Sequence, residues 1–388
     1  MEAYLDNAAT TRAFDSVRDA MVNAISIDYG NPSSKHRKGM EAEQKVKEAA
    51  NIIAKSLKVE VKELTFTSGG TESNNMALIG AALANQRAGK HIITTQFEHP
   101  SVHSPLMFLE EQGFRVSYIS VDQLGHVNMD ELLQEICDET ILVSIMYVNN
   151  EVGAVQDITE ISKQIKAKKP DILLHVDAIQ AYGKYRIYPK RMGIDLLSIS
   201  GHKIHGPKGS GVLFVKDRVK IKPLIYGGEQ QKGMRSGTEN VPAYVGLGQA
   251  VTEIYENHEE KIEYLYQLKE HMIQELKQLP EVTINGYDDS IDIKQTAPHI
   301  ISASFGGVKS EVLLHALEDR GIYVSSGSAC SSNHPGLSGT LVAIGVDKEL
   351  LDSTIRFSFS VNTLMEEIDY TISVLKELLP RLRMFTRK

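Results

Sequence analysis

The stretches ILVSI (141–145), ILLHV (172–176) and DLLSIS (195–200) decide the fold of this chain. Each is a short, nearly continuous run of apolar residues, which is typical of a strand that is buried on both faces. A helix-length segment, TEISKQIKAKKP (159–170), separates the first two stretches and ends at a proline. Parallel strands need such crossover helices, so the stretches predict strands of one parallel sheet covered by helices.

Four more runs extend this pattern: LTFT (64–67), HIITT (91–95), VSYIS (116–120) and GVLFV (211–215). The last run follows the strand DLLSIS after a glycine-rich turn that is too short for a crossover helix, so we expect this pair to be antiparallel. Together the runs predict a three-layer α/β/α domain with a mostly parallel seven-stranded sheet.

The pattern changes after about residue 250. The segment EEKIEYLYQLKEHMIQELKQL (259–279) has apolar residues at helical spacing and ends at Pro280. HIISASF (299–305) and the alternating STIRFSFS (353–360) follow as predicted strands, and a last amphipathic helix completes the chain. This mixture predicts a smaller domain of the α+β type.

The length of 388 residues fits two or three domains, at roughly 100–200 residues each. We therefore assign residues 15–256 to a large domain. Residues 1–14 and 257–388 form a small domain in this division, which carries the loop around Cys330.

The composition is that of an ordinary soluble globular protein, with 42% hydrophobic and 24% charged residues. The net charge of −8 argues against a dedicated nucleic-acid binder, which would be basic. No apolar stretch approaches the roughly 18 residues of a membrane span, and MEAYLDNAATT at the start does not resemble a signal peptide. With only two cysteines, we expect a reducing, cytoplasmic setting and no disulfide framework.

The two cysteines differ in their surroundings. Cys137 lies on an apolar helical stripe with Leu133 and Ile136, so we expect a thiol in the core. Cys330 lies in SSGSACSSNHPG (325–336), a loop of small polar residues that cannot bury it, which points to a reactive nucleophile. Nothing adjacent to Cys330 is cationic, so the sequence does not indicate what activates it.

Three motifs place polar groups at the carboxyl ends of predicted strands, where open parallel sheets bind ligands. They are TFTSGGTESNN (65–75) with its two glycines and Thr71, HVDAIQ (175–180) with Asp177, and SISGHKIHGPKGSG (198–211) with Lys203. The first can cradle a phosphate at a helix start, the second can pair with a cationic ring nitrogen, and the third can form an imine. Taken singly, each has a structural alternative, namely a turn capped by threonine, a helix-capping aspartate and a surface lysine.

Two further residues join this set. His99 follows the strand HIITT, although a histidine at a helix start is often structural. Arg356 alternates with apolar residues in STIRFSFS and can hold a carboxylate, although it can also be a solvent-facing strand residue. An anion site, an acid, an amine and an aromatic ring at one sheet edge match the needs of pyridoxal 5′-phosphate.

Eight motifs, in order, closely resemble the cysteine desulfurases of the IscS/NifS type, which are fold-type I enzymes of the class V aminotransferase family. The resemblance covers essentially the whole chain. The motifs are YLDNAATT, TSGGTESNN, EHPS, YVNNEVGAVQ, HVDAIQ, SGHKIHGPKG, RSGTEN and SSGSACSS.

The resemblance implies a reaction and a set of roles. Sulfur is removed from L-cysteine, giving L-alanine and a persulfide on Cys330. The persulfide passes to an acceptor protein for iron–sulfur cluster assembly or tRNA thiolation. Lys203 binds the cofactor aldehyde covalently and moves the substrate proton. Asp177 keeps the pyridine nitrogen protonated, and His99 stacks on the ring and takes part in proton transfer.

The remaining implied contacts concern the cofactor phosphate, its phenolic oxygen and the substrate carboxylate. The phosphate is held by Gly70, Thr71, Ser200 and His202, and by Thr238 of a neighbouring subunit, so that a homodimer is expected. Asn150 and Gln180 lie near the phenolic oxygen, and Arg356, with Asn150, binds the substrate.

Other functions are open to this sequence. A selenocysteine lyase or another β-lyase could use the same residues, and a non-catalytic assembly scaffold could keep the fold without the chemistry. A metal enzyme is poorly supported, because the histidines and cysteines lack HExxH or paired CxxC spacing. We expect neither nucleic acid nor a membrane among the direct partners.

Overall fold

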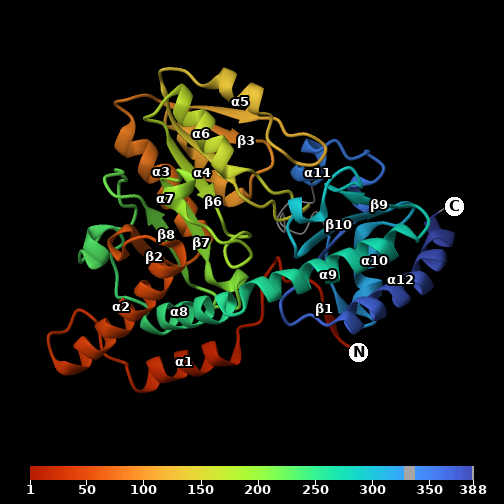
Figure 1. The fold of residues 1–388 in the computed structure, drawn as a ribbon, viewed down its shortest axis with the longest axis horizontal. Helices are drawn as coiled ribbons and strands as arrows, with labels where there is room; N and C mark the ends of the chain where they lie inside the picture. Colours follow the sequence, from red (N-terminus) through yellow and green to blue (C-terminus); the bar gives the residue numbers. More distant parts are fainter. Residues whose placement is uncertain (327–336, 387–388) are drawn as a thin grey trace.

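The structure is a computed structural model, which describes residues 1–326 and 337–386. Two sheets organise it (Figure 1), a seven-stranded one and a four-stranded one. The helices are α1 (Asp15–Ser26), α2 (Arg37–Leu57), α3 (Gly70–Asn85), α4 (Pro100–Glu111), α5 (Met129–Glu135), α6 (Ile158–Lys168), α7 (Pro189–Met192), α8 (Val241–Tyr255), α9 (His258–Lys277), α10 (Ser310–Glu318), α11 (Gly339–Ala343) and α12 (Met365–Thr386).

The seven-stranded sheet confirms the predicted fold class. Its strands, in spatial order, are β2 (Leu64–Thr67), β8 (Gly211–Val215), β7 (Leu196–Ser200), β6 (Leu173–Asp177), β5 (Thr140–Met146), β3 (His91–Thr95) and β4 (Arg115–Ile119). β8 is antiparallel to both of its neighbours, and the other pairings are parallel. The carboxyl ends of β2, β3, β5, β6 and β7 therefore meet at one edge.

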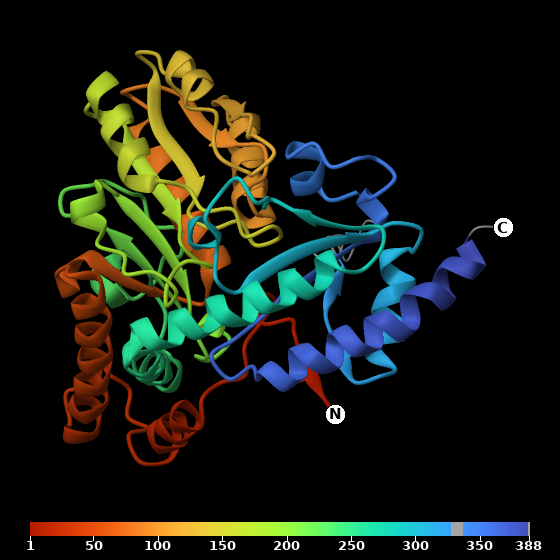
Figure 2. The same cartoon turned by 45° about the vertical axis from the view of Figure 1, so that its right-hand side comes forward.

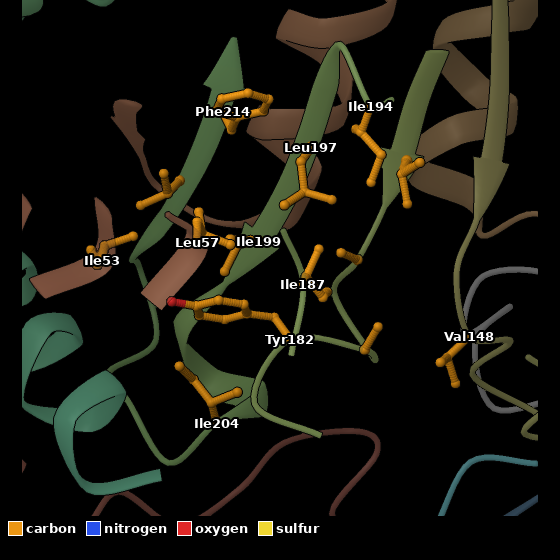
Figure 3. Packing of buried hydrophobic residues seen from close by; sticks show 14 of the residues in the cluster. Ile53, Leu57, Val148, Tyr182, Ile187, Ile194, Leu197, Ile199, Ile204 and Phe214 are labelled. Carbon is orange, nitrogen blue, oxygen red and sulfur yellow. The ribbon is translucent and has the colours of Figure 1, made fainter. Parts of the chain in front are cut away.

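Helices cover both faces of this sheet, because alternate strand residues point to opposite sides. Leu196 packs with α3 and α4 in one apolar cluster, whereas its neighbour Leu197 packs in a second cluster with α2, α6 and α8. In Figure 3, Leu197 and Ile199 of β7 point into the second cluster, which also holds Leu57 of α2 and the ring of Tyr182.

The second sheet is antiparallel and belongs to the later part of the chain. Its order is β12 (Ser325–Ser326), β13 (Thr354–Ser358), β10 (Ile300–Phe305) and β9 (Val282–Asn285). Residues of α9, α10 and α12 form an apolar cluster with it. Figure 1 and Figure 2 both show α9 running from the region of α8 to this second sheet.

The start of the chain joins the second sheet region. β1 (Ala3–Tyr4) pairs in parallel with β11 (Ile322–Tyr323), and Ala3 and Leu5 belong to the same apolar cluster as the four-stranded sheet. The domain boundaries at residues 14/15 and 256/257 stay a prediction. Within the described residues, no helix is both long and apolar enough to span a bilayer.

One expectation about the core is wrong. Cys137 is exposed rather than buried. The helix α5 ends at Glu135, and Ile136 already has extended backbone angles (φ −66°, ψ 120°), so the apolar helical stripe stops before it reaches the thiol. Cys330 lies outside the described residues.

Candidate active site

A cavity of about 470 Å³ lies at the shared carboxyl edge of the large sheet. Arg356 of β13 also lines it, so the cavity lies where the two sheets approach each other. Its lining includes these predicted site residues: Gly70, Thr71, His99, Asn150, Asp177, Gln180, Ser200, His202, Lys203 and Arg356. Their roles there stay predictions, but the fold brings them to one place.

Asp177, the last residue of β6, is a buried carboxylate. It accepts hydrogen bonds from the Ile179 N–H at 2.9 Å and from Asn74 Nδ2 at 2.8 Å. Burial raises the pKa of Asp177 above its ordinary value, because the charged form has lost its water. A cationic group in the cavity, such as a protonated ring nitrogen, would compensate for that loss.

Lys203 follows the end of β7 in the short turn Gly201–Lys203. Its Nζ donates to the carbonyl oxygens of Ala8 at 2.5 Å and Ala9 at 2.8 Å. Behind it lies the buried Lys184, whose Nζ donates to the Lys203 carbonyl at 2.7 Å. This bond holds the backbone that carries Lys203, so the amine is presented to the cavity from a fixed turn.

Part of the lining is suited to an anion. Gly70 and Thr71 are the first residues of α3, where backbone N–H groups and the helix dipole favour negative charge. Ser200 Oγ is buried and has no hydrogen-bond partner among the described residues, so a bound oxyanion would satisfy it. Burial lowers the pKa of His202 to about 4, which leaves its imidazole neutral at pH 7.

The sequence left open that Thr71 caps the helix, and the structure shows a different N-cap residue. Thr71 does not cap α3; the N-cap residue is Gly69, whose φ is +152°. Only glycine adopts such an angle readily, which explains a glycine directly before the helix. The Thr71 side chain is left available at the helix start.

His99 is the N-cap residue of α4. Its Nδ1 accepts from the Ser101 N–H at 3.1 Å and lies 2.8 Å from Ser101 Oγ. Burial lowers the pKa of His99, although the nearby Asp177 acts in the opposite direction. The ring is thus held by the first turn of the helix while it lines the cavity.

Arg356 is buried, with 5% exposure, so the alternative of a solvent-facing strand arginine is wrong. Its Nη1 donates to the Asn150 carbonyl at 2.9 Å, and its Nη2 donates to Asp6 Oδ1 at 2.8 Å. Nε is buried and has no partner among the described residues. The guanidinium is therefore fixed in direction and keeps a donor for a further acceptor.

The two remaining predicted residues differ in their surroundings. Gln180 donates from Nε2 to the Ala8 carbonyl at 2.9 Å and accepts from His299 Nε2 at 3.2 Å. Thr238 is exposed and is not among the described residues that line the cavity. Since the prediction placed Thr238 in the site of a neighbouring subunit, that contact stays a prediction.

Sequence reasoning missed several residues that form hydrogen bonds or an ion pair with the predicted ones. Asp6 pairs with Arg356, and Asn74 and Ser101 link Asp177 to His99. Each lies inside a motif that was recognised, namely YLDNAATT, TSGGTESNN and EHPS. The motifs placed these residues at the site. They did not reveal the contacts of Asp6 and Asn74, because Arg356 lies 350 residues from Asp6 and Asp177 lies 103 residues from Asn74.

Comparison with known proteins assigns the chain to a family. The aminotransferase class-V family profile matches residues 3–371. The chain is 42% identical over 383 residues to the cysteine desulfurase IscS of Dictyoglomus turgidum, covering 98% of this chain and 95% of the relative. It is 43% identical to the cysteine desulfurase IscS of Salmonella paratyphi C, covering 98% and 93%.

Solved structures give the same assignment. A NifS-like protein superposes with a TM-score of 0.92 at 36% identity, covering 98% of this chain and all of the other. SspA in complex with cysteine superposes with a TM-score of 0.78 at 32% identity, covering 93% of this chain and all of the other. This chain therefore belongs to the class V aminotransferase family, among the cysteine desulfurases of the IscS/NifS type.

Proposed function

We propose that this chain is a pyridoxal 5′-phosphate-dependent cysteine desulfurase, which converts L-cysteine to L-alanine and leaves the sulfur as a persulfide on Cys330. The observation that carries the proposal is one cavity that combines Lys203, the buried Asp177 and the unpartnered Ser200 hydroxyl. The family assignment supports the same chemistry.

The residues fit the cofactor on two counts. A buried carboxylate with a raised pKa suits a protonated pyridine nitrogen, and the start of α3 with Ser200 suits a phosphate. Lys203 would hold the aldehyde, Asp177 the ring nitrogen, and Gly70, Thr71, Ser200 and His202 the phosphate. When bound, the cofactor supplies an electron sink for the carbanion at the substrate Cα.

The protein's own side chains orient the substrate, remove its proton and accept its sulfur. Arg356 orients the substrate through its carboxylate, and the Asn150 carbonyl keeps the guanidinium in place. Lys203 Nζ removes the proton at the substrate Cα. The Cys330 thiolate attacks the substrate sulfur, so the C–S bond breaks while an S–S bond forms. The carbon side, once protonated, leaves as alanine.

Three finer statements belong to this proposal. The enzyme acts as a homodimer in which Thr238 of one subunit completes the phosphate site of the other. The persulfide passes to an acceptor protein of iron–sulfur cluster assembly or tRNA thiolation. The enzyme works in the cytoplasm.

The test is production of alanine and sulfide from L-cysteine by the purified protein in the presence of a thiol. Lys203→Ala is expected to abolish turnover and the absorbance band of the bound aldehyde, whereas Lys208→Ala, an exposed lysine on the same loop, is expected to keep both. Cys330→Ser should retain the band and lose the persulfide. A borohydride adduct mapped to a lysine other than Lys203 would overturn the proposal.

A further inference from the structure

A continuous chain of hydrogen bonds joins the two groups expected to contact the cofactor ring. Asn74 Nδ2 donates to Asp177 Oδ2 at 2.8 Å and to Ser101 Oγ at 2.9 Å. Ser101 Oγ lies 2.8 Å from His99 Nδ1. Asn74, Ser101 and Asp177 are all buried, so water does not compete for these bonds.

The hydrogens in this chain have one consistent arrangement. The amide of Asn74 has two N–H hydrogens, and it gives one to Asp177 and one to Ser101. Because His99 Nδ1 accepts from the backbone N–H of Ser101, it carries no hydrogen of its own, and the Ser101 hydroxyl at 2.8 Å is therefore the donor in their contact. Nδ1 also accepts from the Ser101 N–H at 3.1 Å. The His99 proton is consequently on Nε2.

The same geometry opposes a second proton on His99. That proton would have to go to Nδ1, where it would meet the backbone N–H and the hydroxyl of Ser101. His99 is also the N-cap of α4, a helix of 12 residues whose dipole disfavours a cation at this end.

The charged groups around His99 have opposite effects on the pKa of its imidazole. Burial is the main cause that lowers the pKa of His99; Asp177 acts against it, and Lys203 and Arg356 act with it. Burial raises the pKa of Glu98 to about 8, so this neighbour is neutral at pH 7. Burial also lowers the pKa of His103, one turn along α4, so it adds no positive charge.

We propose that Asn74 and Ser101 are positioning residues that hold His99 as a neutral imidazole with its proton on Nε2. In this form the ring has one N–H donor, at Nε2, and any proton that His99 gives during the reaction would leave from that nitrogen. The inference rests on the proposed function for the identity of the ring that His99 contacts.

The first test needs no substitution. In holoenzyme carrying ¹⁵N-labelled histidine, long-range ¹H–¹⁵N correlations distinguish the two ring nitrogens, and His99→Gln assigns the signals among the 13 histidines. We expect an unprotonated Nδ1 and a protonated Nε2 that persist from about pH 8.5 to about pH 5.5, a range in which an ordinary histidine titrates. A charged ring, or a proton on Nδ1, at neutral pH would overturn the inference.

Variants then test the role of the hydroxyl. Ser101→Ala removes one of the two donors to Nδ1, so the midpoint of the His99 titration should rise by about one pH unit. Ser101→Thr restores the hydroxyl and should restore the midpoint. Ser104→Ala, an exposed serine in the same helix, should leave the His99 signals unchanged. Equal titration curves for Ser101→Ala and Ser104→Ala would contradict the proposed role.

Failure of this inference can be told apart from failure of the proposed function. If the wild-type protein forms alanine from cysteine but His99 titrates normally, only the positioning role is wrong. If the protein neither binds the cofactor nor forms alanine, the function is wrong, and the NMR measurement on the protein without cofactor still decides the state of His99.

Discussion

At the scale of single residues, Glu98 beside His99 is a carboxylic acid enclosed by protein. Its Oε1 accepts from Thr95 Oγ1 and from the Met146 N–H, each at 2.8 Å, while Oε2 is buried without a partner among the described residues. Burial raises its pKa from 4.5 to about 8. Because the folded pKa is the higher one, Glu98 contributes stability below pH 4.5 that is lost as the pH rises toward 8.

Replacing Glu98 with glutamine should remove this pH dependence, because glutamine stays neutral. The unfolding free energy of the wild type, relative to that of Glu98→Gln, should fall between about pH 5 and pH 8.5 by a few kcal/mol in order of magnitude. Urea unfolding of both proteins at the two pH values measures the difference. Glu111→Gln, at the exposed end of α4, is the control and should follow the wild type. If the unfolding free energies of Glu98→Gln and the wild type changed equally with pH, Glu98 would not be a buried neutral acid.

At the scale of secondary-structure elements, most of the fold could be predicted from apolar runs. The strands predicted at residues 64–67, 91–95 and 211–215 have the bounds of β2, β3 and β8, and the antiparallel pair of β7 and β8 is confirmed. The ends of helices were harder to predict than the strands. α5 ends at Glu135, before the predicted helical stripe reaches Cys137.

The candidate site likewise has a part that could be predicted from the sequence and a part that could not. Asp177, Lys203 and His99 could be placed from sequence, because strand order alone takes their backbones to one edge. The partners of the site residues could not. Asn74 is 103 residues from Asp177, and Asp6 is 350 residues from Arg356, so each contact depends on tertiary packing that no local pattern encodes.

The start of α3 gives a prediction at this scale. A Cβ at Gly70 would lie 2.2 Å from Ile179 Cδ1 and 2.8 Å from Ile179 Cγ1, so Gly70→Ala must displace the Ile179 side chain, which also lines the cavity. We expect cofactor affinity to fall at least about tenfold, which corresponds to roughly 1.4 kcal/mol. Titration of the protein without cofactor, followed by absorbance, measures the dissociation constant.

The matched control is Gly339→Ala at the start of α11. Its Cβ would meet no atom of the described residues within 4 Å and its φ is not positive, so cofactor affinity should be unchanged. An unchanged affinity for Gly70→Ala as well would show that the start of α3 is not close to the phosphate.

At the scale of the whole molecule, the first residues of the chain tie the two sheets together. Asp6 pairs with Arg356 of the small sheet, whereas the carbonyls of Ala8 and Ala9 accept from Lys203 of the large one. Thr11 continues this contact, because its N–H and Oγ1 both donate to the His202 carbonyl at 2.9 Å. The N-terminal segment thus contacts both the residue expected to bind the substrate carboxylate and the residue expected to bind the cofactor.

This arrangement makes Asp6 a competitor of the substrate. Its carboxylate occupies Nη2 of Arg356 at 2.8 Å, and a substrate carboxylate needs two adjacent guanidinium donors for a bidentate contact. Asp6→Asn removes the competing charge, while the Asn150 carbonyl still fixes Nη1. We expect the KM for L-cysteine to fall roughly fivefold, or about 1 kcal/mol, with little change in kcat.

Steady-state kinetics of the holoenzyme, together with the dissociation constant of the product L-alanine, measure this effect. Asp15→Asn makes the same change of charge at an exposed aspartate paired with Arg18, and it should leave both constants unchanged. If Asp6→Asn instead raised both constants, Asp6 would be required to hold Arg356 in place, and the N-terminal segment would be a support for the substrate site rather than a competitor for it.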